Sequence, residues 1–307
     1  MEHTIRKSTK LKRVRKDWQV YLLLVPTVAY FLIFCYYPMY GAQIAFRDYV
    51  PMRGIWESKW VGLMNFNRFF ISPFFVQVLS NTLRISVYAL IAGFPAPIIL
   101  ALFLNYQRHP KLTKIVQTVS YAPHFISVVV LIGMIQVFFS PYRGPVSAVY
   151  RWMGLKMENI LASPAAFDDL YVWSGIWAGT GWSAIIYIGA LTTVSPELHE
   201  AATVDGASIM QRIWNIDLPS ILPTIMLVLI MSCGSLLSVG FEKAYLLQNS
   251  VNANTSEVIS TYVYKQGIQK TQFSYSSAVG LFNSVVNFII IVIVNTVSKK
   301  LTETGLF

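Results

Sequence analysis

Residues 200–219 read Glu-Ala-Ala-Thr-Val-Asp-Gly-Ala-Ser-Ile-Met-Gln-Arg-Ile-Trp-Asn-Ile-Asp-Leu-Pro, and they separate two long apolar runs at 170–194 and 221–241. A helix of about 20 apolar residues crosses roughly 30 Å of hydrocarbon, because each residue rises about 1.5 Å. Both runs are long enough to do this. The amphipathic stretch between them therefore predicts a surface loop that joins two membrane-spanning helices.

Four more apolar runs of similar length lie at 18–46, 76–105, 114–139 and 278–297. The composition agrees with them, since 55% of the 307 residues are hydrophobic and 12% are charged, against roughly 25% charged residues in a soluble domain. Helix breakers such as Pro26, Pro95 and Pro123 lie inside the runs, which favours a bundle with a partly polar interior over separate anchors. The sequence predicts an all-α integral membrane protein with six transmembrane helices.

The domain organisation is expected to be simple. The chain shows no internal repeat and no Gly/Ser-rich linker, so we expect one membrane domain, 18–307, behind a short basic tail, 1–17. The first apolar run exceeds the about 7–15 residues of a signal-peptide core, and no small-x-small cleavage site follows it cleanly. We therefore expect this run to remain as the first span.

The distribution of Lys and Arg predicts the orientation, because these residues collect at the cytoplasmic ends of membrane helices. With six spans, the tail, the loop after the second span, the 195–219 loop and the C-terminus share one side. The basic residues on that side are Arg6, Lys7, Lys10, Lys12, Arg13, Arg15, Lys16, Arg108, Lys111, Lys114, Lys299 and Lys300. The opposite loops also carry basic residues, so the bias depends mainly on the tail. We expect both termini and the 195–219 loop to be cytoplasmic.

The 195–219 loop carries the signals of two short helices. Ser195, Pro196 and Glu197 favour a helix start, because Ser caps a first turn, Pro fits it and an acid suits the positive helix end. Gly206 permits a backbone turn that other residues resist. A second helix is expected over 207–214. The sequence therefore predicts a helix, a glycine corner and a helix ahead of the fifth span.

The charge of this loop favours a protein partner over a position flat on the lipid surface. An interfacial helix carries many Lys and Arg on its polar face, but here only Arg212 is present. It stands among the acids Glu197, Glu200, Asp205 and Asp217. Acids facing an anionic leaflet are unfavourable, so we expect the loop to be held by another protein.

The spacing of the loop resembles the EAA signature of bacterial ABC importer permeases. Glu200-Ala201-Ala202 is followed after three residues by Gly206, and nine residues later by Ile216-Asp217-Leu218-Pro219. Residues 21–26, the Tyr37-Pro38 pair and the Gly62-Leu63-x-Asn65-Phe66 segment resemble the carbohydrate subgroup of the maltose and glycerol-phosphate type. Within it, the chain is most similar to polysaccharide and complex-oligosaccharide importer permeases of Gram-positive bacteria.

The resemblance implies a type I ABC importer fold in the bacterial cell membrane and a set of partners. These are a second and different permease subunit, a cytoplasmic ATPase dimer, an extracellular substrate-binding lipoprotein and a carbohydrate substrate. It also implies that Glu200 faces a basic residue of the ATPase and that Gly206 forms the corner of the coupling loop. The implied ATPase-coupling residues are Glu200, Ala201, Ala202, Asp205, Gly206, Ala207, Ile216, Leu218 and Pro219.

Several functions are excluded by what the sequence lacks. No Gly-x-x-x-x-Gly-Lys-Ser/Thr phosphate loop, His-Glu-x-x-His or Gly-x-Ser-x-Gly motif occurs. We therefore expect no enzyme and no cofactor in this chain, with ATP and Mg bound by the partner ATPase. The histidines are scattered without metal-ligand spacing. The net charge of +10 fits membrane topology rather than nucleic-acid binding.

Sugar recognition uses aromatic faces and hydrogen-bonding side chains in concave sites. The predicted substrate-pathway residues are Asn81, Tyr88, Gln136, Trp177, Glu242, Asn283 and Asn287, with Trp173, Trp182, Tyr187 and Lys243 as further candidates. Asn283 and Asn287 are four residues apart, so they share one helix face. They predict a polar pathway, although hydrogen bonding between helices explains the pair nearly as well.

Two other functions remain open from the sequence. One is an importer for a non-sugar solute, such as peptides or phosphorylated polyols, because the signature does not name the solute. The other is a membrane channel or scaffold that needs no ATPase, for which the 195–219 loop is dispensable. The favoured prediction is a permease subunit that imports carbohydrate by alternating access, driven through the loop.

Overall fold

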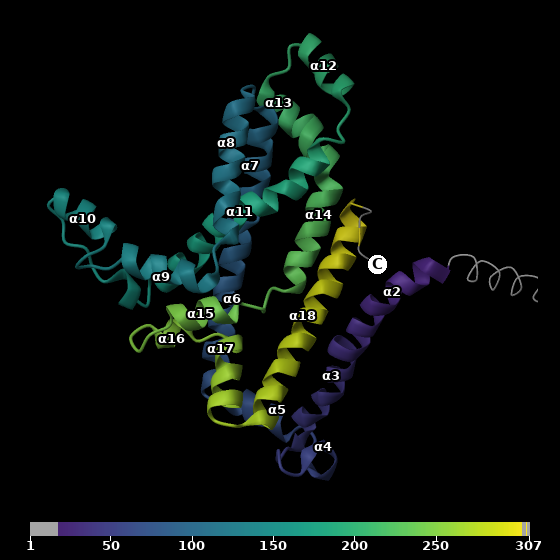
Figure 1. The fold of residues 1–307 in the computed structure, drawn as a ribbon, viewed down its shortest axis with the longest axis vertical. Helices are drawn as coiled ribbons and strands as arrows, with labels where there is room; N and C mark the ends of the chain where they lie inside the picture. The colour runs from purple at the N-terminus through teal and green to yellow at the C-terminus, as the bar shows by residue number, and fades with distance from the viewer. Residues whose placement is uncertain (1–17, 303–304, 306–307) are drawn as a thin grey trace, which may run out of the picture.

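The computed structural model describes residues 18–302 and 305, and the predicted basic tail lies outside this range. The described chain is almost entirely helical and elongated (Figure 1). Helix α12 (Pro196–Val204) projects at one end, and α4 (Gly54–Glu57) lies at the other. The prediction of an all-α protein is confirmed.

The first apolar run forms a continuous helix that stands apart from the bundle for most of its length. It consists of α2 (Trp18–Tyr30), the π-helical turn Phe31–Tyr36, α3 (Tyr37–Met39) and the 3-10 segment Tyr40–Phe46. None of the residues in the first three of these segments is buried. Only the last segment packs closely, against α18 (Phe273–Thr302).

A two-stranded hairpin follows, with β1 (Arg47–Asp48) antiparallel to β2 (Lys59–Trp60) around α4. Asn65 at the start of α5 (Met64–Ile71) is buried, and its side-chain amide donates to the carbonyls of Ala45 and Arg47 at 3.0 and 3.2 Å. These bonds fasten the end of the first helix to α5. They give the Gly62-Leu63-x-Asn65-Phe66 segment a structural role.

The second apolar run is one bent helix of 33 residues, formed by α6 (Phe74–Gly93) and α7 (Pro95–Tyr106). Helix α8 (Pro110–Tyr121) runs back beside α7. Helix α11 (Phe167–Leu191) packs across α6, α7 and α8. At its crossing with α8, a Cβ on Gly181 would lie 2.1 Å from the carbonyl oxygen of Ser120, so only glycine allows this close approach.

The predicted third span, 114–139, is broken in the structure near the helix breaker Pro123. Helix α8 continues through a 3-10 turn (Ala122–Phe125) that contains Pro123, and α9 (Val128–Phe138) then leaves at a bend of 103°. The bend arises because Ile126 is extended and Ser127 caps a new helix by accepting from the backbone N–H of Val130. Beyond α9, a side arm carries α10 (Pro145–Trp152) and a 3-10 turn (Ile160–Ala162).

The sequence predicts a separate second helix in the 195–219 loop. In the structure this helix instead forms the first turns of the helical run that contains the predicted fifth span. Helix α13 (Ile209–Arg212), a π-helical turn (Ile213–Asp217) and α14 (Leu218–Gly234) make one run of 26 residues. The wide π turn allows Pro219 to follow without breaking the run. The helical run that contains the predicted fifth span therefore extends over Ile209–Gly234 rather than about 221–241.

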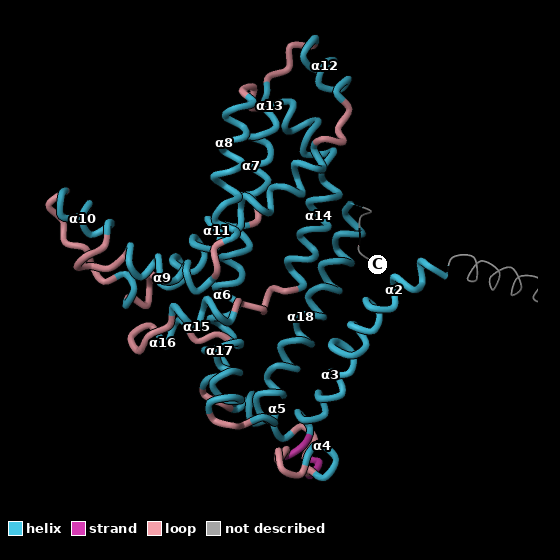
Figure 2. The backbone as a smooth tube through the Cα atoms, in the orientation of Figure 1, coloured by secondary structure: helices cyan, strands magenta, loops and turns pink. Residues whose placement is uncertain are grey.

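The last part of the chain folds back before it crosses the bundle again. Helix α14 ends in an irregular segment, which the tube in Figure 2 draws as loop. Three short helices follow, α15 (Phe241–Leu247), α16 (Ala253–Ser256) and α17 (Ile259–Tyr264), and a π turn (Lys265–Gln269) leads into α18. Helix α18 packs along α14.

The predicted count of six spans is not confirmed. In the described part of the chain, four runs are long and apolar enough to cross a membrane: Trp18–Phe46, Phe74–Tyr106, Ile209–Gly234 and Phe273–Lys300. The bent pair of α8 and α9 makes a fifth if it counts as one span. Helix α11 has 25 residues but is not among these runs. Its Trp, Gly and Ser residues and the pair Asp168 and Asp169 lower its hydropathy.

Candidate functional site

The 195–219 loop contains the predicted helix and the predicted glycine corner. Helix α12 begins after Ser195 with Pro196 in its first turn, but the Ser195 side chain makes no capping hydrogen bond, so the expected serine cap is wrong. Gly206 has a φ of +77°, in the left-handed region that glycine favours. The Ala207 N–H donates to the Ala202 carbonyl at 2.8 Å and the Gly206 N–H to the Thr203 carbonyl at 3.1 Å. This pair of bonds is a Schellman motif, which ends α12 and turns the chain toward α13.

The next helix starts with a capping box, two residues after the corner. Ser208 accepts from the backbone N–H of Gln211 at 3.4 Å, and the Gln211 side chain accepts from the Ser208 N–H at 2.7 Å. Two helix ends that are both capped by local bonds leave little freedom in the short connection between them. The elbow formed by α12 and α13 is therefore a defined structure.

The predicted coupling residues fall into two groups. Glu200, Ala201, Asp205 and Gly206 are exposed, while Ala202 and Ala207 are half-buried. Val204 on the same helix is 88% exposed, so the described residues leave this apolar part of α12 uncovered. In the second group, Ile216 and Leu218 are half-buried against the bundle, and Pro219 is exposed. The first group presents a surface, and the second anchors it.

Asp217 lies at the centre of the anchor and was not among the predicted site residues. Its side chain is 0% exposed. One carboxylate oxygen accepts a hydrogen bond from the Tyr106 hydroxyl at 2.6 Å, and the other lies 3.3 Å from Nε2 of His199. Tyr106 ends α7 and His199 belongs to α12. One buried carboxylate thus joins α12, α7 and the start of α14.

Arg212 adds a second link at the same place. Its guanidinium donates to the Thr203 hydroxyl on α12 at 3.0 Å and lies over the ring of Tyr106, 5.5 Å from its centre. The ring of His199 also meets Tyr106 edge-on. We call Tyr106, His199, Arg212 and Asp217 the junction cluster. It connects the exposed face of α12 mechanically to two long helices of the bundle.

A cavity of about 350 Å³ lies between α6, α11 and α14. Its wall is rich in hydroxyl groups, and we call it the serine-rich cavity. The hydroxyls belong to Ser86, Ser183, Ser232, Ser235, Ser238, Tyr171 and Tyr187. The Ser86 and Tyr187 hydroxyls are buried and have no hydrogen-bond partner among the residues that the structure describes. Buried polar groups without partners are rare and require an explanation, and a polar ligand or water in the cavity would satisfy both.

None of the seven predicted pathway residues lines this cavity, although the further candidate Tyr187 does. Asn81 is buried and donates to the carbonyls of Asn254 and Glu257, and Gln136 lines a separate small cavity. Trp177 and Glu242 are exposed. Their placement shows that the predicted set does not form one site.

The Asn283 and Asn287 pair serves the contact between helices more than a pathway. Asn287 accepts from the backbone N–H of Leu237 at 2.9 Å and donates to the Ser238 hydroxyl at 3.1 Å. Asn287 on α18 therefore holds the irregular segment that follows α14. The Asn283 amide oxygen is buried, and none of the described residues bonds to it. Of the two explanations that the sequence left open for Asn287, these bonds fit hydrogen bonding between helices.

Tyr88 belongs to a polar group on the outer face of α6 and α11. Its hydroxyl donates to Asp169 at 2.7 Å and accepts from the Trp173 indole at 2.9 Å. Arg84, one turn earlier, forms an ion pair with Asp168 at 2.5 Å. Arg84 lies within the Phe74–Tyr106 run, where a charged side chain facing lipid is costly. This face therefore needs a polar or protein neighbour.

Lys243 is a cation without an acidic partner. It takes part in none of the ion pairs in the described part of the chain. Its ammonium donates to the Tyr171 carbonyl and lies over the Tyr171 ring, 4.5 Å from its centre. Burial lowers the pKa of Lys243 from 10.5 to about 8. The lysine remains mostly charged at neutral pH, beside a residue that lines the serine-rich cavity.

We expect Lys243→Met to raise the Tm at pH 7 by about 2–3 °C, or about 1–2 kcal/mol for a chain of this size, because it removes a desolvated charge. The folded-state pKa lies below the unfolded one. The unfolded chain therefore binds more protons between roughly pH 8 and 10.5, and wild-type stability rises with pH there. Tryptophan fluorescence during thermal unfolding in detergent at pH 7 and 9 measures both effects. A variant whose excess in Tm over the wild type does not shrink from pH 7 to 9 contradicts this assignment.

The structure combines long apolar helices, a polar cavity between them and an exposed elbow tied to two of them. This combination defines the class of membrane transport subunits. The chain belongs to the family of binding-protein-dependent transport system inner membrane components, which it matches over residues 93–303. The predictions of an ABC importer permease, and of a subunit that is not an enzyme, are confirmed by this membership and by the relatives.

Three similar proteins cover nearly the whole chain. Protein LplB of Bacillus subtilis is 42% identical over 294 residues, 96% of this chain and 92% of that protein. The polygalacturonan/rhamnogalacturonan transport system permease protein YteP of Bacillus subtilis is 41% identical over 302 residues, with 98% and 94% covered. The crystal structure of a bacterial ABC transporter for import of the acidic polysaccharide alginate matches with a TM-score of 0.88 and 39% identity, with 96% and 99% covered.

Proposed function

We propose that this chain is one of two permease subunits of an ATP-driven importer that moves an oligosaccharide or polysaccharide into the cell. The observation that carries the proposal is the elbow at 195–219. Its exposed acidic and apolar face is presented by α12 and tied through buried Asp217 to α7 and α14. A surface that only contacted lipid or water would not need a buried anchor of this kind. The proposed driver is a separate ATPase.

The proposed topology keeps six spans in one membrane domain. They are the four long apolar runs, the bent pair of α8 and α9, and α11. In Figure 1, α12 and the turn between α7 and α8 lie at the top, and the start of α2 and the end of α18 lie on the right. Helix α4 lies at the bottom, and α10 and α16 lie on the left. This separation supports an arrangement with the termini and the elbow in the cytoplasm and the side arm outside.

In the proposed mechanism, α12 sits in a groove of the ATPase, and Glu200 faces a basic residue there. Closure of the ATPase dimer moves α12. The junction cluster then passes this displacement to α7 through Tyr106 and to α14 through Asp217. Because α7 and α14 belong to helical runs that wall the serine-rich cavity, their movement changes which side of the membrane the cavity faces.

A second permease is proposed to cover the surfaces that this chain leaves open. Helix α2 has no buried residue, and the Arg84–Asp168 pair lies on an outer face at membrane depth. A different permease, giving a heterodimer, would satisfy that face, and the polar group around Tyr88 would then lie between the subunits. The substrate would pass from an extracellular binding protein along this polar face and the serine-rich cavity. ATP and Mg would be bound by the ATPase.

We further propose that the substrate carries carboxylates. The proteins named for polygalacturonan/rhamnogalacturonan and alginate transport handle acidic polysaccharides, and both match nearly the whole chain. Lys243 supplies a cation with no acidic partner in the described chain, next to the cavity wall at Tyr171. A uronate-containing chain would offer hydroxyl groups to the serines and a carboxylate to this lysine.

Co-purification tests the proposed function. A tagged wild-type chain, extracted in detergent, is expected to bring down a second permease and an ATPase. Glu200→Lys is expected to lower the recovery of the ATPase by about 30-fold and keep the second permease, because a reversed charge at a desolvated interface costs about 2 kcal/mol or more.

The matched control is Glu158→Lys, which makes the same change at an exposed position in the side arm. It is expected to keep the ATPase at the wild-type level. A wild-type chain that purifies without any ATPase contradicts the importer and supports a channel or scaffold. Equal ATPase recovery with Glu200→Lys contradicts the role of α12.

A further inference from the structure

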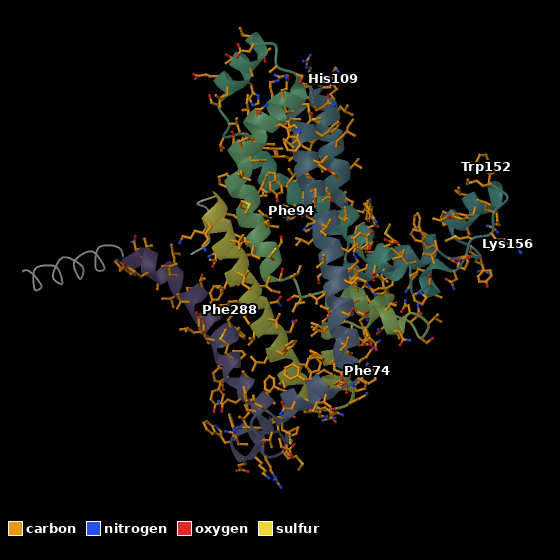
Figure 3. All side chains as sticks on the ribbon, turned by 180° about the vertical axis from the view of Figure 1, so that it is seen from behind. Phe74, Phe94, His109, Trp152, Lys156 and Phe288 are labelled. Carbon is orange, nitrogen blue, oxygen red and sulfur yellow. The ribbon has the colours of Figure 1, made fainter. Side chains whose placement is uncertain are left out.

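A second surface at the same end of the molecule is a groove of about 740 Å³ between α7 and the run formed by α13 and α14. Figure 3 shows this end, where His109 labels the turn after α7. The groove is lined mainly by apolar side chains, and many of them are open to the surroundings. Ile99 is 64% exposed, Met210 61% and Trp214 65%. Nothing in the described chain covers them.

The length of the groove matches one leaflet of a bilayer. Helix α7 has 12 residues, and the groove follows it from Pro95 to Tyr106. At about 1.5 Å per residue this is about 18 Å, close to half of a hydrocarbon core of roughly 30 Å. An extended acyl chain therefore fits along the groove, with its head at the turn that follows α7.

The turn beyond the groove is cationic. Gln107, Arg108 and His109 line the end of the groove, and no acidic residue lines it. Lys111 and Lys114 follow on the first turns of α8 and are exposed. None of these side chains takes part in the ion pairs of the described residues. An apolar slot that ends in unpaired cations matches a ligand with an apolar tail and an anionic head.

We propose that this groove binds an anionic phospholipid of the inner leaflet, with an acyl chain along α7 and the phosphate beside Arg108. The proposal rests on the proposed function for its orientation, since it needs this end of the bundle to be cytoplasmic. Anionic lipids are concentrated in that leaflet, and basic pockets between helices on that side recognise their head groups. In this orientation the exposed indole of Trp214, at the same end of the groove, would lie near the membrane interface that tryptophan side chains favour.

The charge of the two neighbouring surfaces argues against the ATPase as the occupant of the groove. The exposed face of α12 is acidic, with Glu197, Glu200 and Asp205, whereas the groove end is basic. One protein partner would have to match both signs within a short distance, but a lipid needs to match only the groove. The bound lipid would contact Met210 and Trp214, directly beside the junction cluster, and so stabilise the packing of α13 on α7.

Native mass spectrometry of the purified transporter complex, in mixed phosphatidylglycerol and phosphatidylcholine micelles, tests the proposal. The wild type is expected to retain phosphatidylglycerol in preference to phosphatidylcholine. The double variant Arg108→Gln with Lys111→Gln is expected to bind it about 30-fold more weakly, or about 1 kcal/mol per cation. Ile99→Trp fills the groove at an exposed position without changing charge, and it is expected to reduce retention as well.

The matched control is Arg151→Gln with Lys156→Gln, an equal loss of charge on the exposed side arm, which is expected to retain the lipid. Equal retention by all variants, or no preference for phosphatidylglycerol in the wild type, overturns the proposal. Cross-linking of Ile99→Cys to the second permease also overturns it, because a protein then fills the groove. The ATPase content of the same samples reports on the proposed function separately.

Discussion

Gly206→Pro is expected to abolish substrate uptake while the chain still inserts into the membrane. Proline fixes φ near −65°, whereas Gly206 has a φ of +77°. The variant also loses the N–H that donates to the Thr203 carbonyl at 3.1 Å, and it disfavours the turn conformation of Asp205 before it, at φ −73° and ψ 0°. A cost of about 3 kcal/mol or more exceeds what a short exposed elbow can absorb, so α12 loses its orientation. Uptake of labelled substrate in cells, with membrane amounts measured by immunoblot, checks this.

The structure offers a closely matched control at Gly154 after α10. Its φ is +74°, and its N–H donates to the Arg151 carbonyl at 3.0 Å. The preceding residue, Met153, has nearly the same backbone angles as Asp205. Gly154→Pro therefore introduces the same backbone conflict in the side arm and is expected to keep most of the uptake. Equal loss of uptake in both variants would mean that the elbow has no special role.

The parts of the fold that could be predicted from the sequence depend on local signals. Ser195-Pro196 and Gly206 act through their own backbone conformation and their immediate neighbours, so the start of α12 and its corner are where the sequence places them. The long apolar runs are recognisable because crossing a membrane imposes a length. The helix after the corner was misjudged because Pro219 looks like a boundary, and only the π turn before it lets the helix continue.

The junction cluster could not be predicted, because its members come from separate parts of the chain. Tyr106 and Asp217 are 111 residues apart, and they meet only when α7 packs against the run that leads into α14. In the sequence, Asp217 is one acid among four in a polar loop. The sequence clue for a buried role is that Asp217 is a single carboxylate between two apolar residues, Ile216 and Leu218, immediately before a membrane span.

The serine-rich cavity was missed for a different reason. Ser and Thr in membrane helices often bond to the carbonyl four residues earlier, as Ser232 does with Val228, so serines alone do not indicate a pathway. Asn and Trp residues were predicted to line the substrate pathway, but Asn81 and Asn287 form hydrogen bonds with backbone groups of neighbouring segments. The spacing of Ser232, Ser235 and Ser238 at the end of α14 was the available clue. Only the packing of α6 and α11 shows that these hydroxyls face one cavity.

Asp217→Asn is expected to separate ATP hydrolysis from transport. The amide keeps the size of the side chain, but it removes the carboxylate charge that accepts from the Tyr106 hydroxyl and whose other oxygen lies 3.3 Å from Nε2 of His199. Hydrogen bonds to charged groups contribute about 1.5–3 kcal/mol each, and α12 would then shift relative to α14 when the ATPase closes. In proteoliposomes of the whole complex, we expect uptake to fall about 10-fold or more while ATP hydrolysis stays within about twofold of wild type, which is about 1.4 kcal/mol of lost coupling.

Two further variants show whether this effect passes through His199. In a His199→Gln background, Asp217→Asn is expected to add little to the loss, because residues that act as one unit give non-additive effects. Asp48→Asn makes the same chemical change at an exposed position in β1 and is expected to leave both activities unchanged. If uptake and hydrolysis fall in proportion in Asp217→Asn, the complex is simply less stable. If the two substitutions add fully, His199 and Asp217 act separately and the junction cluster does not transmit the movement of α12.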